Sequence, residues 1–253
     1  VYANTAPEQV KQRLADADVA VLNKVKLHEK NLAGTAVRLI CVAATGYDNI
    51  DTAYCRKTGV ALCNVPGYST DSVAQLTLAT VLALSTHLIT YREAVHSGYY
   101  SQCGTPNILS PVWHELAGKT WGIVGCGNIG RKVAKVAEAM GCKVLAYRRK
   151  TDPDFETVDL DTLLAQSDIV SIHLALLPTT KHIINAESIA KMKNGVRILN
   201  FARGELVNNE DIKKALEDKK VSCYVVDFPC AETVNQKGII AIPHLGASTE
   251  ESE

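Results

Sequence analysis

The chain has 253 residues, with 27 acidic and 27 basic side chains, and so carries no formal net charge. This balance argues against a role on nucleic acid or at a membrane surface that charge would drive, and the length fits one large domain or two ordinary ones. The eight cysteines lack zinc-site spacing and any Cys-x-x-Cys pair, so we expect reduced thiols in a cytoplasmic protein and no metal site.

Strands alternate with helices in the first 67 residues, as in a parallel sheet with helical crossovers. Strands are predicted at 1–4, 19–22, 37–43 and 60–64, and helices at 7–17, 27–33 and 50–58. Pro66-Gly67-Tyr68 then interrupts the pattern and is expected to be a hinge. We therefore assign 1–67 to a first, smaller domain.

One long helix is predicted for residues 73–94, after the hinge. Its apolar residues cover most of its circumference, which indicates burial on several sides, between domains or between subunits. We therefore expect a homodimer through the 72–94 region. Thr, Ser and His residues along the helix argue against a membrane span, and residues 97–111, without any period, predict an extended arm.

A strand, a glycine turn and a helix come next. The apolar run at 120–124 is followed by Gly125-x-Gly127-x-x-Gly130 and then by apolar residues at helical spacing. In a dinucleotide site Gly125 permits the tight turn, Gly127 lets the backbone approach a pyrophosphate, and Gly130 lets the helix pack on its strand. The helix N-terminus offers N–H groups to the phosphates. The alternative is a tight turn that holds no ligand.

Six strands alternate with helices from Thr120 onward. They are predicted at 120–124, 143–147, 169–173, 196–201, 222–226 and 239–242, with Asn185 and Asn208 as helix N-caps. This order is typical of a doubly wound sheet built from two mononucleotide-binding halves. We predict an α/β protein: a Rossmann dinucleotide-binding domain at 68–244, a smaller flavodoxin-like parallel-sheet domain before it, and a return toward that domain at 245–253.

Ligands of such sheets bind beyond the carboxyl ends of the strands, where special residues gather in this sequence. The strands are followed by Gly125 to Gly127, Arg148-Arg149, Leu174-Ala175, Ala202-Arg203, Asp227 and Pro243-His244. The predicted cofactor-binding residues are Gly125, Gly127, Asn128, Ile129, Gly130, Arg148, Arg149, Leu174, Ala175, Thr180, Phe201, Ala202, Asp227, His244 and Gly246.

Arg148 bears on the choice of cofactor. An NAD site usually carries Asp or Glu about 20 residues after its first glycine, to bind the ribose 2′-hydroxyl. Here that place, at the end of the second strand, holds Arg148. Arginine suits a 2′-phosphate through its charge and planar donors, so Arg148 and Arg149 favour NADP(H). The alternative is a basic turn that stacks on adenine without selecting phosphate, as NAD(H) would require.

Arg203, Glu232 and His244 are the catalytic candidates. The Arg203 guanidinium can hold a carboxylate with two hydrogen bonds and polarise a neighbouring carbonyl. His244 can donate a proton to that carbonyl oxygen, and Glu232 can pair with the histidine, favour its protonated form and fix its tautomer. Each has a structural alternative: a surface ion-pair arginine, a solvated loop glutamate, and a histidine satisfied in the core.

Together these motifs resemble the D-isomer-specific 2-hydroxyacid dehydrogenase family over essentially the whole chain. The matching stretches are 43–51 (AATGYDNID), 64–74 (NVPGYSTDSVA), the turn at Gly125, 173–180 (HLALLPTT), 200–204 (NFARG), Asp227 and 243–247 (PHLGA). The resemblance implies hydride transfer between a nicotinamide cofactor and a 2-keto or D-2-hydroxy acid, with Arg203, Glu232 and His244 as catalytic residues. It also implies that the amides of Ala44, Thr45 and Gly46 bind the substrate carboxylate, together with Arg203, and that Asp227 lies near the nicotinamide amide.

A few positions depart from the family pattern. Glu232 is followed by Thr233 where the family has proline, only 12 residues separate Glu232 from His244, and Ala175 replaces a proline. Family members also have a strand and helix before Val1 and a long helix after Glu253. We therefore expect the chain to be incomplete at both termini.

Within the family, residues 44–51 and 64–74 look most similar to hydroxypyruvate/glyoxylate reductases (glycerate dehydrogenases), and this is the activity that we expect. D-3-phosphoglycerate dehydrogenase is an alternative, because 200–204, 227–229 and 242–249 also resemble its compact forms. A dinucleotide-sensing transcriptional corepressor is the alternative of another class.

Overall fold

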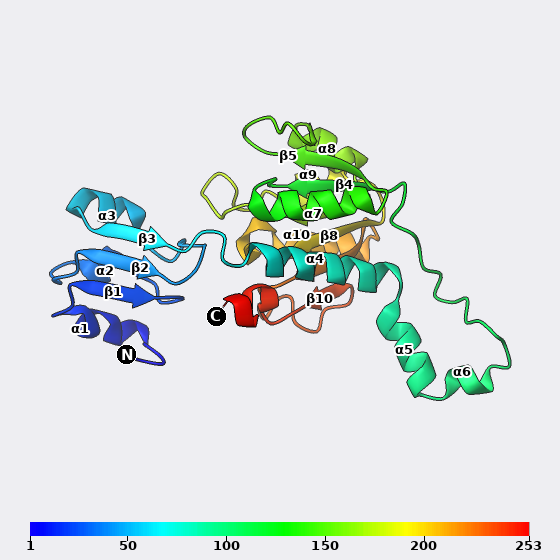
Figure 1. Cartoon of the computed structure of the whole chain (residues 1–253), viewed down its shortest axis with the longest axis horizontal. Coiled ribbons are helices and arrows are strands. Elements are labelled where there is room, and N and C mark those ends of the chain that lie inside the picture. The colour runs from blue at the N-terminus through cyan, green and yellow to red at the C-terminus, as the bar shows by residue number, and fades with distance from the viewer. Residues whose placement is uncertain (253) are drawn as a thin grey trace. The chain divides into compact units, whose positions relative to one another are not determined.

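The structure is a computed structural model that describes residues 1–252, which divide into two compact units, Val1–Ser69 and Thr70 onward (Figure 1). Unit 1 contains a parallel sheet in the order β1-β2-β3. Its strands are β1 (Val19–Leu22), β2 (Leu39–Val42) and β3 (Ala61–Asn64), and its helices are α1 (Val10–Leu14), α2 (Glu29–Leu32) and α3 (Thr52–Thr58). Ile40 and Val42 of β2 pack with Leu27 and Ile50 in its core.

The strand predicted at 1–4 is wrong. These described residues lie outside the sheet, and Val1 and Tyr2 are exposed, so an added strand here gains no burial. The Arg13 guanidinium instead binds the Asn4 carbonyl and the Thr5 hydroxyl, each at 2.6 Å. The segment is therefore held by side-chain contacts to α1.

Unit 2 is built on a parallel seven-stranded sheet in the order β10-β9-β8-β7-β4-β5-β6. The strands are β4 (Thr120–Val124), β5 (Lys143–Tyr147), β6 (Glu156–Thr157), β7 (Ile169–Ile172), β8 (Val196–Asn200), β9 (Val221–Val226) and β10 (Ile239–Ala241). The chain runs from β4 outward on one side and from β7 outward on the other, which confirms the predicted doubly wound sheet. Only β6 was not predicted, because its two residues show no apolar pattern.

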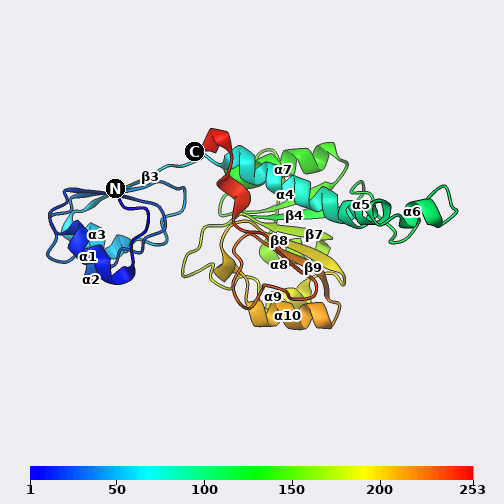
Figure 2. The ribbon, with the colours of Figure 1, turned by 90° about the horizontal axis from the view of Figure 1, so that it is seen from below.

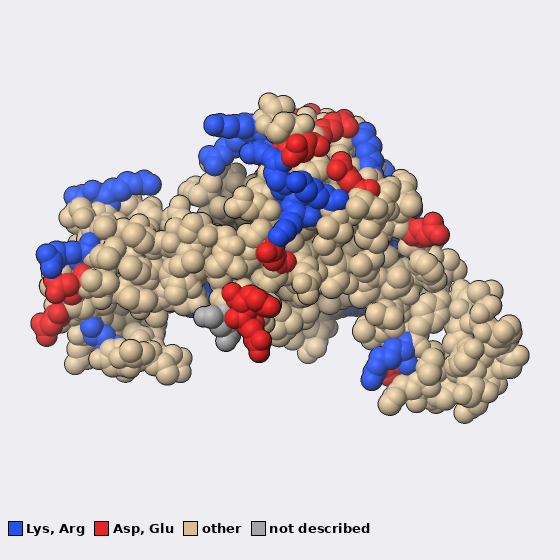
Figure 3. All heavy atoms as spheres, viewed as in Figure 1, with Lys and Arg blue, Asp and Glu red and all other residues tan. Residues whose placement is uncertain are grey.

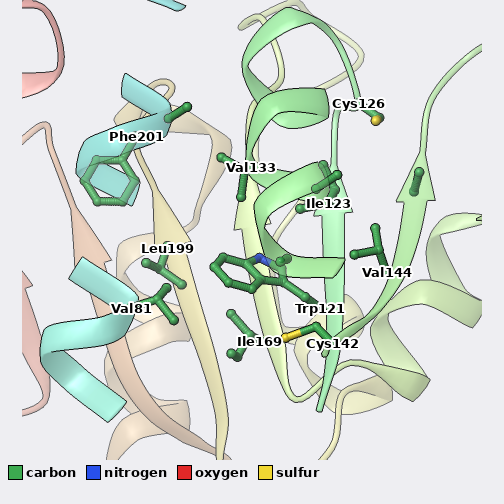
Figure 4. Packing of buried hydrophobic residues seen from close by; sticks show 14 of the residues in the cluster. Val81, Trp121, Ile123, Cys126, Val133, Cys142, Val144, Ile169, Leu199 and Phe201 are labelled. Atoms are coloured by element: carbon green, nitrogen blue, oxygen red, sulfur yellow. The ribbon is translucent and has the colours of Figure 1, made fainter. Parts of the chain in front are cut away.

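Helices cover both faces of this sheet (Figure 2). One face carries α4 (Thr70–Ser85) and α7 (Asn128–Ala139), and the other carries α8 (Leu160–Gln166), α9 (Ala186–Lys191) and α10 (Asn209–Glu217). Trp121 of β4 is fully buried under the first layer, and Figure 4 shows its ring in the cluster that includes Val81, Val133 and Leu199. Burying a large apolar side chain contributes about 1.5–3 kcal/mol, so this layer fixes the strand that precedes the glycine turn.

Side chains begin the helices on the second face as predicted. The Asn185 carboxamide accepts a hydrogen bond from the Ser188 N–H at 3.1 Å, and the Asn208 carboxamide accepts from the Glu210 and Asp211 N–H groups. Each N-cap satisfies backbone donors that a helix leaves open, which is worth about 1 kcal/mol.

The single helix predicted for 73–94 is wrong, because the helix breaks after Ser85. A second helix, α5 (Leu88–His96), follows Thr86 and His87, and the two axes differ by 59°. His87 has a left-handed φ of 51°, which stops the helical hydrogen-bond pattern. Within residues 1–252, no single helix is both long and apolar enough to cross a membrane, and only the bent pair of α4 and α5 meets those limits together.

Residues 88–115, here named the arm, extend from the sheet of unit 2 (Figures 1 and 2). The arm contains α5 and one turn of helix, α6 (Tyr99–Gln102), which the sequence did not predict. Its chain folds back on itself through a hydrogen bond from the Tyr91 hydroxyl to the Pro111 carbonyl. Its exposed large apolar side chains are Leu88, Ile89, Val95, Tyr99, Tyr100, Leu109, Val112 and Trp113.

Candidate active site

The carboxyl ends of the parallel strands lie along one edge of the unit 2 sheet, and the predicted site residues follow them in spatial order. From β10 across to β5 these residues are His244, Asp227, Arg203, Leu174, Gly125 and Arg148. The two halves of the sheet meet between β7 and β4, next to Gly125. Ligands of doubly wound sheets bind beyond the carboxyl ends of the strands, where the two halves of the sheet meet.

The three glycines of the turn meet different surroundings. Gly125 has a φ of 101°, and a Cβ there would lie 2.8 Å from the His173 carbonyl carbon. A Cβ on Gly130 would lie 2.4 Å from the Gly125 oxygen, so both positions exclude a side chain. A Cβ on Gly127, by contrast, would meet no atom of the described residues within 4 Å. Packing thus requires Gly125 and Gly130, whereas Gly127 faces open space.

This turn fits the pyrophosphate of a dinucleotide. Gly127 is the N-cap of the twelve-residue helix α7 and has no side chain to cap it. The N–H groups at Asn128 and Ile129 begin the helix, where the positive end of the helix dipole attracts an anion. The open side of Gly127 lies next to this helix end, as a backbone that approaches a pyrophosphate requires.

Arg148 follows β5 and is held in an ion network. Its guanidinium pairs with Asp152, which also binds the Arg131 Nη2 at 2.5 Å. The Asp152 side chain has no exposed surface, whereas Arg149 is exposed. Arg131 also pairs with Asp154. The network connects the end of β5 with the first turn of α7, and Figure 3 shows Lys and Arg side chains gathered there with acidic ones beside them.

Asp152 was not predicted as part of the site. Burial alone would raise the pKa of Asp152, but the Asp154 N–H and the two guanidinium groups outweigh burial and lower it. The residue follows Gly125 by 27 positions (152 − 125), in a turn beyond the strand, so the strand-end criterion missed it. Asp152 is therefore a fixed partner of Arg148 within this ion network.

Thr180 shapes the loop after β7. Its hydroxyl donates to the Ala175 carbonyl and accepts from the Leu177 N–H, each at 2.8 Å. Leu174 is partly buried and Ala175 is exposed. Thr180 therefore positions the backbone of Leu174 and Ala175 at the sheet edge.

Asn200 positions the loop that carries Arg203. Its side chain is fully buried, donates to the Arg203 carbonyl at 2.8 Å and accepts from the Ala202 N–H at 3.2 Å. The Arg203 guanidinium donates to the Ala202 carbonyl, also at 2.8 Å. The Phe201 ring lies in the core, as Figure 4 shows. Asn200 was quoted in a motif but not recognised as a positioning residue.

His244 and Asp227 come together at the far end of this edge. The buried Asp227 carboxylate accepts the Leu245 N–H at 2.8 Å and the Gly246 N–H at 3.2 Å. Its Oδ2 also lies 3.5 Å from His244 Nδ1. His244 has a left-handed φ of 51°, and its ring centroid is 4.2 Å from that of Phe228. Phe228 was not predicted, although it directly follows Asp227.

The expected pair between Glu232 and His244 does not form among the described residues. The exposed Glu232 carboxylate accepts from the Asn209 carboxamide at 2.8 Å, at the start of α10. The buried Thr233 closes the preceding turn, because its hydroxyl accepts from the Cys230 N–H at 2.9 Å. This short turn directs Glu232 to α10, and Asp227 is the carboxylate beside His244.

The predicted substrate-binding residues Ala44, Thr45 and Gly46 belong to unit 1 and follow β2. Three hydrogen bonds connect this loop with Asn64 and Val65, at the end of β3. The Val65 N–H donates to the Ala44 carbonyl at 3.1 Å, the Thr45 hydroxyl donates to the Val65 carbonyl at 3.0 Å, and the Asn64 side chain donates to the Thr45 carbonyl at 2.8 Å. The carbonyl groups of Ala44 and Thr45 are thus engaged within unit 1.

A cavity of about 330 Å³ lies at the opposite, amino-terminal edge of the unit 2 sheet. Lys119, Asp168 and Arg197 are among the residues that line it. Asp168 is bound there by the Thr120 N–H and by Lys193. This cavity is separate from the edge where Arg203 and His244 lie.

Residues 78–246 match the family model described as "D-isomer specific 2-hydroxyacid dehydrogenase, NAD binding domain". The chain belongs to this family. The match confirms the resemblance read from the motifs. As a family member, this dehydrogenase is an oxidoreductase that binds a nicotinamide cofactor, and the family acts on small 2-hydroxy or 2-keto acids.

Relatives cover nearly the whole dehydrogenase chain. A hydroxypyruvate reductase from Blautia hydrogenotrophica is 35% identical over 98% of this chain and 81% of its own. Another from Thermotoga maritima is 38% identical over 87% of this chain and 74% of its own. The crystal structure of D-lactate dehydrogenase from Aquifex aeolicus, in complex with NAD and lactic acid, is 28% identical, with a TM-score of 0.87 over 96% of this chain and 80% of that one.

Proposed function

We propose that this dehydrogenase reduces hydroxypyruvate to D-glycerate or glyoxylate to glycolate, with NADPH as the preferred cofactor. The observation that carries the proposal is the common sheet edge, where Arg203 and His244 approach the same Phe228 ring and the open Gly127 turn lies further along. The names of the two reductase relatives support the choice of substrate.

In this proposal the bound nicotinamide supplies the hydride, and the chain supplies binding, orientation and a proton. The Arg203 guanidinium binds the substrate carboxylate through two hydrogen bonds and polarises the adjacent carbonyl. His244, as imidazolium, donates a proton to the carbonyl oxygen as negative charge develops on it. General acid catalysis of this kind is worth ~10²–10⁴-fold in rate.

Asp227 is the carboxylate that supports His244 in this mechanism. A negative charge 3.5 Å from Nδ1 favours the imidazolium, which is the form needed for reduction. Its bonds to the Leu245 and Gly246 N–H groups hold it in place. The nicotinamide contact of Asp227, the catalytic role of Glu232 and the carboxylate-binding role of Ala44–Gly46 stay predictions from the family resemblance.

The proposed preference for NADPH rests on Arg148 and Arg149, the two arginines that follow β5. Arg148 is held by Asp152, and the exposed Arg149 extends the positive charge, a combination that suits a 2′-phosphate. Arg149→Ala should raise the KM for NADPH several-fold and leave the KM for NADH nearly unchanged. Lys143→Ala, which removes an exposed charge from β5, is the matched control. An equal effect of Arg149→Ala on both cofactors would contradict NADPH selection.

We also propose a homodimer that uses the 72–94 region and the arm. Every residue of α5 keeps some exposure, and Leu88, Ile89 and Val95 are each about 60% exposed, which is unusual for a free surface. Sedimentation of the wild type should give a dimer mass, and Ile89→Lys should give a monomer. Lys135→Glu, an exposed change on α7, serves as a control, and a monomeric wild type would contradict the proposal.

The substrate proposal is tested by initial rates of NADPH and NADH oxidation with hydroxypyruvate, glyoxylate and 3-phosphohydroxypyruvate. Hydroxypyruvate or glyoxylate should give the highest kcat/KM. A preference of tenfold or more for 3-phosphohydroxypyruvate would instead identify a phosphoglycerate dehydrogenase.

A further inference from the structure

The Phe228 ring lies close to both proposed catalytic side chains. Its ring centroid is 4.2 Å from that of His244, with the planes inclined at 48°, and the Arg203 Cζ lies 5.3 Å from the same centroid. We propose that Phe228 is a positioning residue that sets the spacing of Arg203 and His244 and stabilises their cationic forms. The inference rests on the proposed function for its kinetic consequences, but not for the contacts themselves.

The backbone gives the ring little freedom. Phe228 directly follows the buried Asp227, whose carboxylate accepts hydrogen bonds from the Leu245 and Gly246 N–H groups. On the other side, a Cβ added to Gly204 would lie 3.6 Å from the Phe228 Cβ. The half-buried ring also packs against the second core layer. Three loops, after β8, β9 and β10, therefore meet at this ring.

The chemistry of an aromatic ring suits this place. A phenyl face carries partial negative charge and attracts a guanidinium or imidazolium within about 6 Å of its centroid. Asp227 lies beside His244 at Nδ1, and the Arg203 guanidinium lies within this range of the Phe228 ring. The ring can therefore attract both cationic groups and hold them at one place on the sheet edge. A leucine fills part of the same volume but has no such face.

The test compares Phe228→Leu with Phe228→Tyr, which keeps the aromatic face. Steady-state kinetics with hydroxypyruvate and NADPH should give about a tenfold loss in kcat/KM for Phe228→Leu, with both a lower kcat and a higher KM, and near wild-type values for Phe228→Tyr. The Kd for NADPH, measured by fluorescence titration, should stay within twofold. Tyr54→Leu, an aromatic-to-leucine change in α3, is the matched control.

A second readout needs no turnover. In NMR spectra at a fixed pH, the ring resonances of His244, assigned with a His244→Asn variant, should lose the displacement caused by the neighbouring aromatic ring in Phe228→Leu and keep it in Phe228→Tyr. If Phe228→Leu does not fold, Phe228→Met makes the same comparison.

The possible outcomes distinguish a failure of the positioning role of Phe228 from a failure of the proposed function. Equal loss in the Leu and Tyr variants, or wild-type kinetics and His244 resonances in Phe228→Leu, would overturn the positioning role. A wild type that reduces no 2-keto acid would instead overturn the proposed function, and the His244 resonances would still decide whether the ring contacts His244.

Discussion

The Asp227 carboxylate joins the backbone of the Leu245–Gly246 turn to the imidazole of His244, with its Oδ2 3.5 Å from Nδ1. One buried group therefore sets both the position of the histidine and the charge beside it. This arrangement differs from the expected pair of His244 with Glu232, whose carboxylate is bonded to Asn209. Substitutions of Asp227 and Glu232 are therefore expected to affect catalysis differently.

Asp227→Asn should lower kcat/KM for reduction by about tenfold or more at neutral pH. The change removes the negative charge that lies 3.5 Å from the His244 Nδ1, and with it the electrostatic support of the proton donor. Glu232→Gln is the matched comparison, because it removes the same charge from an exposed position. A larger loss of kcat/KM in Glu232→Gln than in Asp227→Asn would show that Glu232 supports His244 after all.

Asp152→Asn should destabilise unit 2 and weaken NADPH binding. The carboxylate has no exposed surface and holds Arg148 and Arg131, whose side chains are about 30% exposed, so two guanidinium groups would lose their common partner. We expect a loss of about 1–3 kcal/mol, or several °C in Tm, by thermal denaturation. Asp154→Asn, which changes a half-exposed carboxylate that pairs with Arg131, should have little effect. Equal effects of the two variants would contradict a special role for Asp152.

His173 should make folding stability depend on mildly acidic pH. Burial lowers its pKa to about 4, and the ring lies 3.0 Å from the Ser171 hydroxyl, which accepts from the Trp121 indole. Because the unfolded chain binds the proton more tightly, stability should be complete above the unfolded pKa, near 6.5, and fall as pH drops toward 4. The loss is about 3 kcal/mol at most.

His173→Gln should flatten this part of the stability profile, as measured by denaturant unfolding between neutral pH and pH of about 4.5. Carboxylates such as Asp168, whose pKa is held below its usual range by the Thr120 N–H and Lys193 in spite of burial, lose their contribution to stability at more acidic pH and so can be distinguished from His173. If the free energy of unfolding depends on pH with the same slope in His173→Gln, groups other than His173 cause the dependence.

The sequence was sufficient for the sheet of unit 2, because each strand is a short apolar run bounded by turn residues, and parallel strands place their carboxyl ends together. That rule, together with the glycine motif and the family resemblance, predicted Gly127, Arg203, Asp227 and His244 at one edge of the sheet. The break at His87 was hidden, because the pattern on both sides of it stays apolar and no Gly or Pro marks it.

The contacts between side chains could not be derived in this way. Phe228 meets Arg203 and His244 only because β9 lies between β8 and β10, so its role depends on sheet order rather than on local pattern. Asp152 reaches Arg131 because a turn folds back over α7. The Glu232 side chain follows a tight turn fixed by Thr233, which spacing along the chain cannot reveal.

The central claim is that His244 gives the proton during 2-keto acid reduction at the edge shared with Arg203. The most direct measurement is the turnover of His244→Ala with NADPH and hydroxypyruvate, beside its NADPH Kd. We predict a kcat lower by ~10²–10⁴-fold with cofactor binding retained. Turnover equal to that of the wild type would contradict the account.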